Sequence, residues 1–326
     1  MSDSLAGAKV VEVAAADADL ERMALLWNQS LPDDLPASTR ALRWSLAPHL
    51  DRDFALFALK RRSLLAWAIV GLQEGSTLGT IDAIAPLAKT GRKDSSGLMV
   101  DAASTWLRQR GATALQFGGG AYSLLRGSPV PERIDEWTGG VTRAVHTDGE
   151  SDLALDLARY TPPSDLETVA GVVQTAQPRD ADNLGELFSA PQLLRVAATN
   201  APATVDDVAL MREVASVGRM SDLMVLWTAN GLEGIAHLIF PDSATPIDIA
   251  YPYALPRAWG AIATILVRDT LSNGAVEMLL DAAARRMHNN GINSSIALGI
   301  AAPQLYTRFG YKSHRAWWLR ARAIES

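Results

Sequence analysis

The feature that most constrains this chain is a stretch that occurs twice. Residues 100–118 read VDAASTWLRQRGATALQFG, and residues 280–299 read LDAAARRMHNNGINSSIALG. In each copy, apolar residues recur at three- and four-residue spacing, which predicts a helix. The helical pattern stops at Gly111 and at Gly291, and a β-prone run follows at once. Because glycine readily ends a helix in the left-handed conformation, the sequence predicts the same helix-to-strand piece in both halves.

The two halves also begin alike. Residues 10–20 read VVEVAAADADL and residues 172–184 read VVQTAQPRDADNL, which predicts a short strand and then a helix that starts near Asp-Ala-Asp. Residues 158–170 separate the patterned segments and contain two consecutive prolines. We therefore predict two modules, residues 1–163 and 164–326, a division that a length of 326 residues allows.

Each half also contains a candidate β-hairpin. One covers residues 53–73, and the other covers 222–240 around Asn230-Gly231, a dipeptide that favours tight two-residue turns. The predicted class is α+β, with two tandem modules that each carry a mixed, mostly antiparallel twisted sheet flanked by helices. The hairpins and the glycine spacing argue against a Rossmann dinucleotide-binding fold.

Composition removes several classes of function. Cysteine is absent, so disulfides, thiol nucleophiles and iron–sulfur clusters are excluded. The net charge is −6, and each half carries −3, with 17 basic against 20 acidic residues before residue 164 and 13 against 16 after it. Because no basic stripe stands out, we expect no nucleic-acid or membrane partner. The five histidines include no pair at helical spacing, so we expect no metal. The start of the chain is not basic and leads into no apolar core, which favours a cytoplasmic protein.

The start of the second repeated helix is a candidate anion site. Residues 272–275 read SNGA and carry no charge. The free main-chain amides of a helix N-terminus attract anions such as a pyrophosphate. An ordinary helix start capped by Ser or Asn explains the same residues, so both interpretations remain open at this point.

The end of the chain carries a family resemblance. Residues 301–318 read AAPQLYTRFGYKSHRAWW, with Leu305-Tyr306 followed by Gly310-Tyr311. This spacing resembles the tail of the GNAT superfamily of acyl-CoA-dependent N-acyltransferases. The first half resembles the leading module of tandem GNAT proteins, so the resemblance covers nearly the whole chain. It implies that acetyl-CoA is a co-substrate.

The resemblance also implies a set of site residues. The pyrophosphate loop of the family falls on Leu271, Gly274 and Val276, of which only Gly274 fits the family pattern. The pantetheine arm pairs with the preceding strand, and Tyr306 serves as general acid for the departing thiolate. The full cofactor-binding set is Thr264, Leu266, Leu271, Ser272, Asn273, Gly274, Ala275 and Val276.

The two halves differ at the matching positions. In the first half the loop falls on Gly91, Asp94 and Ser96, where Asp94 repels a pyrophosphate. Pro86 takes the place that matches Leu266 and has no N–H to give. Only the second half has the tyrosine. We therefore expect a degenerate first module and an acyl-CoA site in the second.

The expected function is transfer of an acetyl group from acetyl-CoA to a primary amine of a small molecule or peptide. Glu233, His237 and Asp248 are candidates for accepting the proton of the amine. The alternative is a catalytically lapsed GNAT-like protein that binds a partner or senses acyl-CoA. A homodimer is compatible with either.

Overall fold

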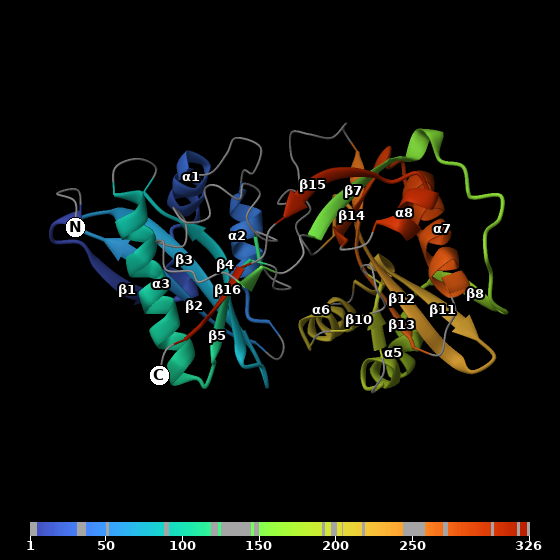
Figure 1. Cartoon of the computed structure of the whole chain (residues 1–326), viewed down its shortest axis with the longest axis horizontal. Helices are drawn as coiled ribbons and strands as arrows, with labels where there is room; N and C mark the ends of the chain where they lie inside the picture. Colours follow the sequence, from blue (N-terminus) through green and yellow to red (C-terminus); the bar gives the residue numbers. More distant parts are fainter. Residues whose placement is uncertain are drawn as a thin grey trace. The chain divides into compact units, whose positions relative to one another are not determined.

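The structure, a computed structural model, is described for most of the chain (Figure 1). The described residues are 5–30, 37–49, 52–87, 91–118, 123–124, 145–146, 150–190, 193–196, 201–203, 205–216, 219–243, 258–269, 273–300, 303–317 and 320–324. They form two compact units, each built on one large sheet, which confirms the predicted α+β class.

The first unit contains a seven-stranded sheet in the order β1-β2-β3-β4-β5-β16-β6. Only β4 and β5 run parallel. The predicted hairpin at 53–73 is confirmed as β2 and β3. The elements are β1 (Lys9–Val13), α1 (Leu20–Ser30), α2 (Thr39–Ser45), β2 (Arg52–Lys60), β3 (Leu64–Gln73), β4 (Leu78–Ala85), α3 (Arg92–Gln109), β5 (Ala114–Phe117), β6 (Val145–His146) and β16 (Arg320–Ala323).

The second unit contains a sheet in the order β15-β7-β14-β13-β12-β11-β8, with β9 and β10 beside it. Among the strand pairs of this unit whose register is described, β13 with β14 is parallel and the others are antiparallel. The elements are β7 (Glu150–Asp156), β8 (Gly171–Thr175), α5 (Ala181–Phe188), β9 (Leu193–Arg195), β10 (Ala201–Pro202), α6 (Val205–Ser216), β11 (Leu223–Thr228), β12 (Gly231–Ile239), β13 (Trp259–Arg268), α7 (Asn273–Asn289), β14 (Ser294–Ile300), α8 (Gln304–Arg308) and β15 (Lys312–Trp317).

Helices cover both faces of the second sheet. The apolar side of α7, with Leu279, Ala283 and Met287, packs on the side chains of one sheet face. Leu187 of α5 and Met211 of α6 pack on the other face. Both repeated helices end as predicted, because Gly111 has φ 85° and Gly291 has φ 77°. The amides of the following residues bond back into the last helical turns.

Chain order alone would place β7 in the first sheet and β16 in the second, and the structure has the reverse. Strand β16 lies in the first sheet, paired with β5 and β6. Strand β7 lies in the second sheet, paired with β14. In Figure 1 the red β16 accordingly runs among blue and cyan strands, and the green β7 runs beside the orange β14. The compact units therefore comprise β1–β6 with β16, and β7–β15. A repeat boundary near residue 163 stays a prediction.

Candidate functional site

The parallel strands of the second unit separate part-way along. Residues Trp259–Ile262 of β13 pair with Ser294–Ala297 of β14, and the pairing stops there. At the same level the register between β12 and β13 shifts, between His237 and Leu238. Such a bulge bends a strand and turns it away from its neighbour. We call this point the second fork. The edge of β13 beyond Ile262, where Thr264 and Leu266 lie, faces into it.

Strand β9 occupies the edge of β13 at this fork. Residues Leu193–Arg195 pair antiparallel with Leu266–Arg268. The amide of Val196 donates to the carbonyl of Ile265 over 2.9 Å. Thr264 is 8% exposed, and its hydroxyl has no hydrogen-bond partner among the described residues. The predicted edge residues therefore lie at the fork, and main chain of the same protein already pairs with that edge.

Tyr306 of α8 reaches the same segment. Its hydroxyl donates to the carbonyl of Val196 over 3.1 Å, and the residue is 2% exposed. Tyr311 packs edge-to-face against it at a centroid distance of 5.6 Å and shares a hydrogen bond of 2.8 Å with Ser295. Burial raises the pKa of Tyr306 well above its ordinary value, Tyr311 raises that pKa further, and Arg195 lowers it. The phenol is therefore protonated at neutral pH.

Arg195 ties β9 across the fork. Its guanidinium donates to the carbonyl of Gly299 on β14 over 3.4 Å. It also forms an ion pair with Asp207 of α6 at 3.6 Å, and both side chains are mostly buried. The sequence analysis missed Arg195 and Val196. A three-residue strand in an irregular stretch between two helices gives no periodic signal.

The first turn of α7 is covered. Leu271 and Ser272 lie outside the described residues, and α7 begins at Asn273. Gly274, Ala275 and Val276 are buried. A Cβ on Gly274 would lie 3.1 Å from the amide nitrogen of Thr168, so the backbone of residues 167–168 lies directly against this turn.

A buried carboxylate stands one residue after the predicted loop. Glu277 is fully buried, accepts a hydrogen bond of 3.0 Å from the amide of Glu167, and forms an ion pair with Arg308. Glu277 lies beyond the first turn of α7, and its charge is paired with Arg308. The residue after the predicted loop is therefore a buried ion pair.

Two of the candidate proton acceptors lie on β12. His237 is fully buried and pairs across the strands with Thr264. Glu233 is buried and accepts a hydrogen bond from the hydroxyl of Thr228. The register of the sheet places His237 at the second fork, whereas Glu233 lies near the far end of the strand. Asp248 lies outside the described residues.

The first unit has an equivalent fork, which is closed differently. Strands β4 and β5 pair only from Leu78 to Ile81, and Asp82 follows. The Asp82 carboxylate accepts hydrogen bonds from Thr80 (2.7 Å) and Ser123 (2.9 Å) and forms a buried ion pair with Arg52. The amide of Leu124 donates to the carbonyl of Asp82 over 2.7 Å. We call this point the first fork.

Strand registers correct one detail of the sequence comparison. The bulge in β3–β4 lies between Ile69 and Val70, and the corresponding bulge in β12–β13 lies between His237 and Leu238. With the bulges aligned, Ala85 corresponds to Leu266, and Pro86 follows one residue later. The number of residues between the matched strand position and the helix-ending glycine differs by one between the two halves. A count backwards from Gly111 and Gly291 therefore pairs the wrong strand residues.

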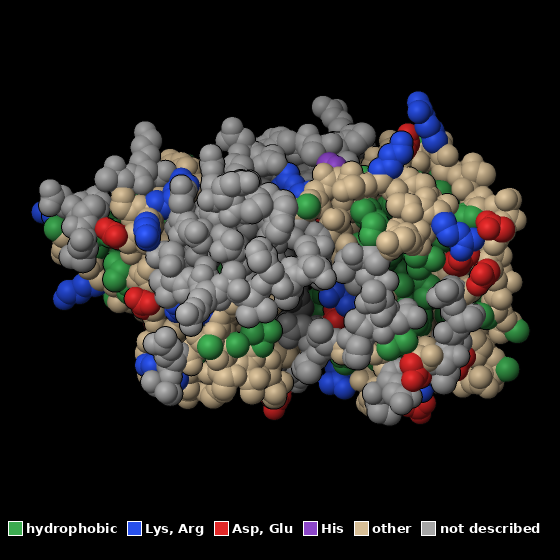
Figure 2. All heavy atoms as spheres, viewed as in Figure 1, with side chains coloured by type: hydrophobic (Ala, Val, Ile, Leu, Met, Phe, Trp, Pro, Cys, Tyr) green, Lys and Arg blue, Asp and Glu red, His purple; other side chains and the backbone are tan. Residues whose placement is uncertain are grey.

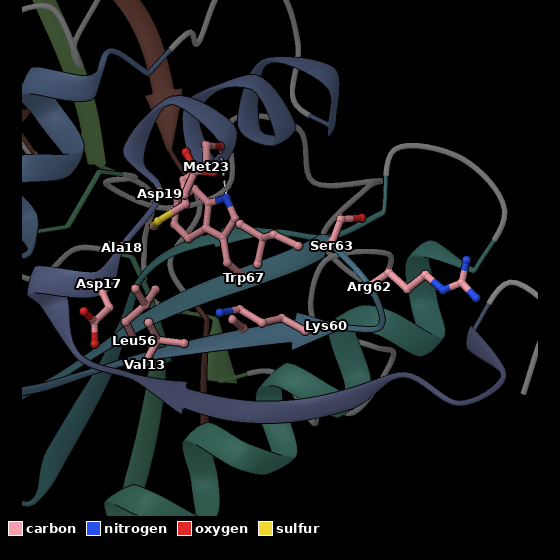
Figure 3. Close-up of a pocket in the computed structure, with 12 residues that line it drawn as sticks. Val13, Asp17, Ala18, Asp19, Met23, Leu56, Lys60, Arg62, Ser63 and Trp67 are labelled. Carbon is pink, nitrogen blue, oxygen red and sulfur yellow. Dashed lines mark hydrogen bonds between the residues drawn. The ribbon is translucent and has the colours of Figure 1, made fainter.

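A separate hollow of about 230 Å³ lies in the first unit beside β1, β2 and β3. Figure 3 shows the buried Trp67 over this hollow, its indole N–H directed at the main chain of Met23, with Lys60 extended below the ring and Arg62 pointing away. Asp17 lies at the other end. None of the site residues predicted from the sequence lines it.

The described surface carries both signs of charge. On the face in Figure 2, Lys and Arg side chains stand interspersed with Asp and Glu. Within the described part of the chain, no His, Asp and Glu side chains gather in a group of three that could hold a metal. None of the described helices combines the length and the apolar character needed to span a bilayer.

No family model matches the sequence, and no curated protein matches it. Solved structures do. A GCN5-related glucosamine N-acetyltransferase region of a fungal multi-domain GH3 β-N-acetylglucosaminidase matches with a TM-score of 0.79 and 15% identity, over 97% of this chain and 38% of that chain. The present chain thus spans well under half of that fungal protein.

Two further structures match along nearly their whole length. A tandem GNAT protein from the clavulanic acid biosynthesis pathway has a TM-score of 0.63 and 16% identity, covering 98% of this chain and 99% of that chain. A GCN5-related N-acetyltransferase from Sphaerobacter thermophilus has a TM-score of 0.56 and 16% identity, covering 100% and 98%. At these identities the likeness concerns the fold, and the chain has the tandem GNAT fold.

Proposed function

We propose that the protein is an N-acetyltransferase that works through its second unit, moving an acetyl group from acetyl-CoA to a primary amine of a small molecule or peptide. The observation that carries this proposal is the position of Tyr306, whose O–H is directed at the second fork. One matching structure is described as a glucosamine N-acetyltransferase region, and an amino sugar is a primary amine of the proposed class.

In the proposed reaction, Tyr306 donates one proton. The amine nitrogen attacks the thioester carbonyl carbon, the carbon–sulfur bond breaks, and the sulfur takes the phenolic proton of Tyr306. The proton that the amine loses passes to His237 or to water, and solvent restores the phenol. Burial raises the pKa of Tyr306, which keeps the phenol protonated at neutral pH and also makes it a weaker acid toward the departing thiolate.

Tyr306→Phe tests this role. Removing a general acid lowers kcat by about 100-fold or more. The measurement is steady-state turnover with a panel of amino sugars and short peptides.

Tyr311→Phe is the matched control for that variant. Tyr311 is equally buried, also makes one hydroxyl hydrogen bond, and contacts the ring of Tyr306. We expect it to keep turnover within about threefold, because it loses packing and one hydrogen bond but no transferable proton. Equal losses in the two variants would assign Tyr306 a structural role only.

A second candidate function has an observation of its own. The fully buried Glu277 and the cover of residues 167–168 lie where the pyrophosphate of a CoA ester is expected. A lapsed GNAT module that binds acyl-CoA or a partner without catalysis accounts for this arrangement. Calorimetric titration with acetyl-CoA separates the two: binding with turnover of an amine supports the enzyme, and binding without turnover of any amine in the panel supports the sensor. A cytoplasmic location and a homodimer stay predictions.

A further inference from the structure

At the second fork, strand β13 pairs with two different strands along the same edge, first with β14 and then with β9. Strand β13 pairs with β14 as far as Ile262, and from Ile265 onwards its free edge pairs with β9 and Val196. Each main-chain N–H of a strand edge donates to one acceptor at a time, and the edge has room for one extended chain beside it. A pantetheine arm that adds to this edge therefore needs the same groups that Val196 and Leu193–Arg195 use.

The segment that fills the fork is short, and it is held by its backbone pairing and by the buried side chains of Leu193 and Val196, which belong to the apolar cores on the two faces of the sheet. It is three residues of strand followed by Val196, with β10 as its outer neighbour. Its side-chain attachment across the fork is Arg195, which contacts the carbonyl of Gly299 and the carboxylate of Asp207. Tyr306 adds a hydrogen bond to the carbonyl of Val196.

The start of α7 is covered by a different segment in the same manner. The amide of Glu167 donates to Glu277, and the backbone of Thr168 lies against Gly274. Both parts of the expected acyl-CoA cleft, the strand edge and the helix start, are therefore covered by main chain of the same protein. As arranged, the cleft does not fit an acyl-CoA.

We propose that residues 193–196 are an internal occupant of the acyl-CoA cleft, and that acyl-CoA binds by displacing them from the edge of β13. This inference rests on the proposed function of the second unit. In the resting state Val196 takes the hydrogen bond of Tyr306. Displacement frees the phenol at the moment the thioester arrives, so the general acid is released only when its substrate is present.

The first experiment uses the unmodified protein and acetyl-CoA as the probe. Hydrogen exchange, followed by mass spectrometry of the peptide that contains residues 193–196, is measured with and without saturating acetyl-CoA. The expected result is faster exchange of the amides of Leu194 and Val196 when acetyl-CoA is bound. Acetyl-CoA binding with unchanged or slower exchange in this peptide overturns the inference and leaves the proposed function standing.

A second experiment removes the side-chain contacts that Arg195 makes for residues 193–196. Arg195→Met removes its contacts to Gly299 and Asp207 without altering the backbone. The apparent affinity for acetyl-CoA is proportional to the fraction of molecules in which residues 193–196 have left the edge of β13. Because the variant raises that fraction, we expect acetyl-CoA to bind about fivefold tighter or more. Arg285→Met is the matched control, since Arg285 pairs with Asp281 on the exposed side of α7 and its loss removes the same charge.

Leu194→Pro gives an independent variant. Val196 bonds with Ile265, and hydrogen-bonded pairs alternate along an antiparallel ladder, so Leu194 presents its N–H to Val267. Proline removes that donor, and we expect tighter binding here also. Equal affinity in Arg195→Met, Leu194→Pro and Arg285→Met overturns the inference. Absence of binding in all of them, with the protein folded, overturns the proposed function together with it.

Discussion

The two forks of this protein have the same strand geometry and opposite kinds of closure. In the first unit, the described residues beyond Ile81 form a side-chain network in which Asp82 bonds to Thr80, Ser123 and Arg52, and the amide of Leu124 adds one main-chain bond to the carbonyl of Asp82. In the second unit, the space beyond Ile262 is filled by the backbone of β9. One closure is a buried polar network, and the other is an extra strand.

The difference decides which fork can open. Withdrawing Asp82 from its network leaves the buried guanidinium of Arg52 without its carboxylate, which is costly in a medium of low polarity. The ion pair of Arg52 and Asp82 packs directly against Gly71, because a Cβ on Gly71 would lie 2.8 Å or less from both side chains. Strand β9 can leave when another extended chain takes over its main-chain bonds and the side chains of Leu193 and Val196 withdraw from the core. The second fork is therefore the one suited to exchange.

The largest effect that would sharpen this comparison is expected for Asp82→Ala. The side chains of Arg52 and Asp82 are 3% and 1% exposed, and loss of one partner of a buried pair costs about 3–5 kcal/mol of unfolding free energy. Denaturant unfolding followed by circular dichroism measures the change. The double variant Arg52→Met with Asp82→Leu recovers most of the loss, because neither charge remains to be buried.

Asp53→Ala is the control for that series. Asp53 pairs with Arg110 at 3.8 Å, but the side chains are 73% and 37% exposed. Exposed pairs contribute about 0–1 kcal/mol, so we expect a change within that range. If Asp82→Ala costs no more than Asp53→Ala, the first fork is not closed by its polar network and the contrast between the forks fails.

A smaller effect is expected at alkaline pH, and it belongs to the second unit. Burial raises the pKa of both Tyr306 and Tyr311 above the unfolded value of about 10. Below pH 10 both states keep the protons and stability is unaffected. Above pH 10 the unfolded chain releases them first, so stability falls as the pH rises further.

Tyrosine variants isolate this contribution. No tyrosine lies among the described residues between 5 and 146, so the first unit lacks the effect in its described part. Between pH 9 and pH 11, Tyr306→Phe and Tyr311→Phe should each flatten the decline in unfolding free energy by one proton. An unchanged slope in both variants would show that the two phenols ionise as readily in the folded state as in the unfolded one.

Much of the fold could be predicted because its signals are local. The helix-ending glycines and the two hairpins rest on patterns within about 20 residues, and the structure contains them where expected. The boundary of the duplication stays a prediction. Strand β9 and the cover formed by Glu167 and Thr168 could not be predicted, because neither carries periodicity and both depend on contacts distant in sequence. No local pattern sets Glu277 apart from other acidic residues of a helix, and only the fold shows that it is buried and paired with Arg308.

The shift between Pro86 and Leu266 has a similar origin. Counting from Gly111 and Gly291 assumes equal spacing, whereas the bulge-aligned registers differ by one residue. Register along a strand depends on pairing with its neighbours, which a count along one segment does not contain.

The exchanged strands have a consequence for biosynthesis. Because β16 sits between β5 and β6, the first sheet cannot be completed until the chain has been made as far as Ala323, after every strand of the second sheet. During translation, the edge of β5 that pairs with β16 therefore stays unpaired while the second sheet forms. An open edge is a place where a nascent chain can pair with a neighbour, so chaperone binding or polysome crowding is expected to influence the yield of this protein more than that of a protein whose modules close in sequence order.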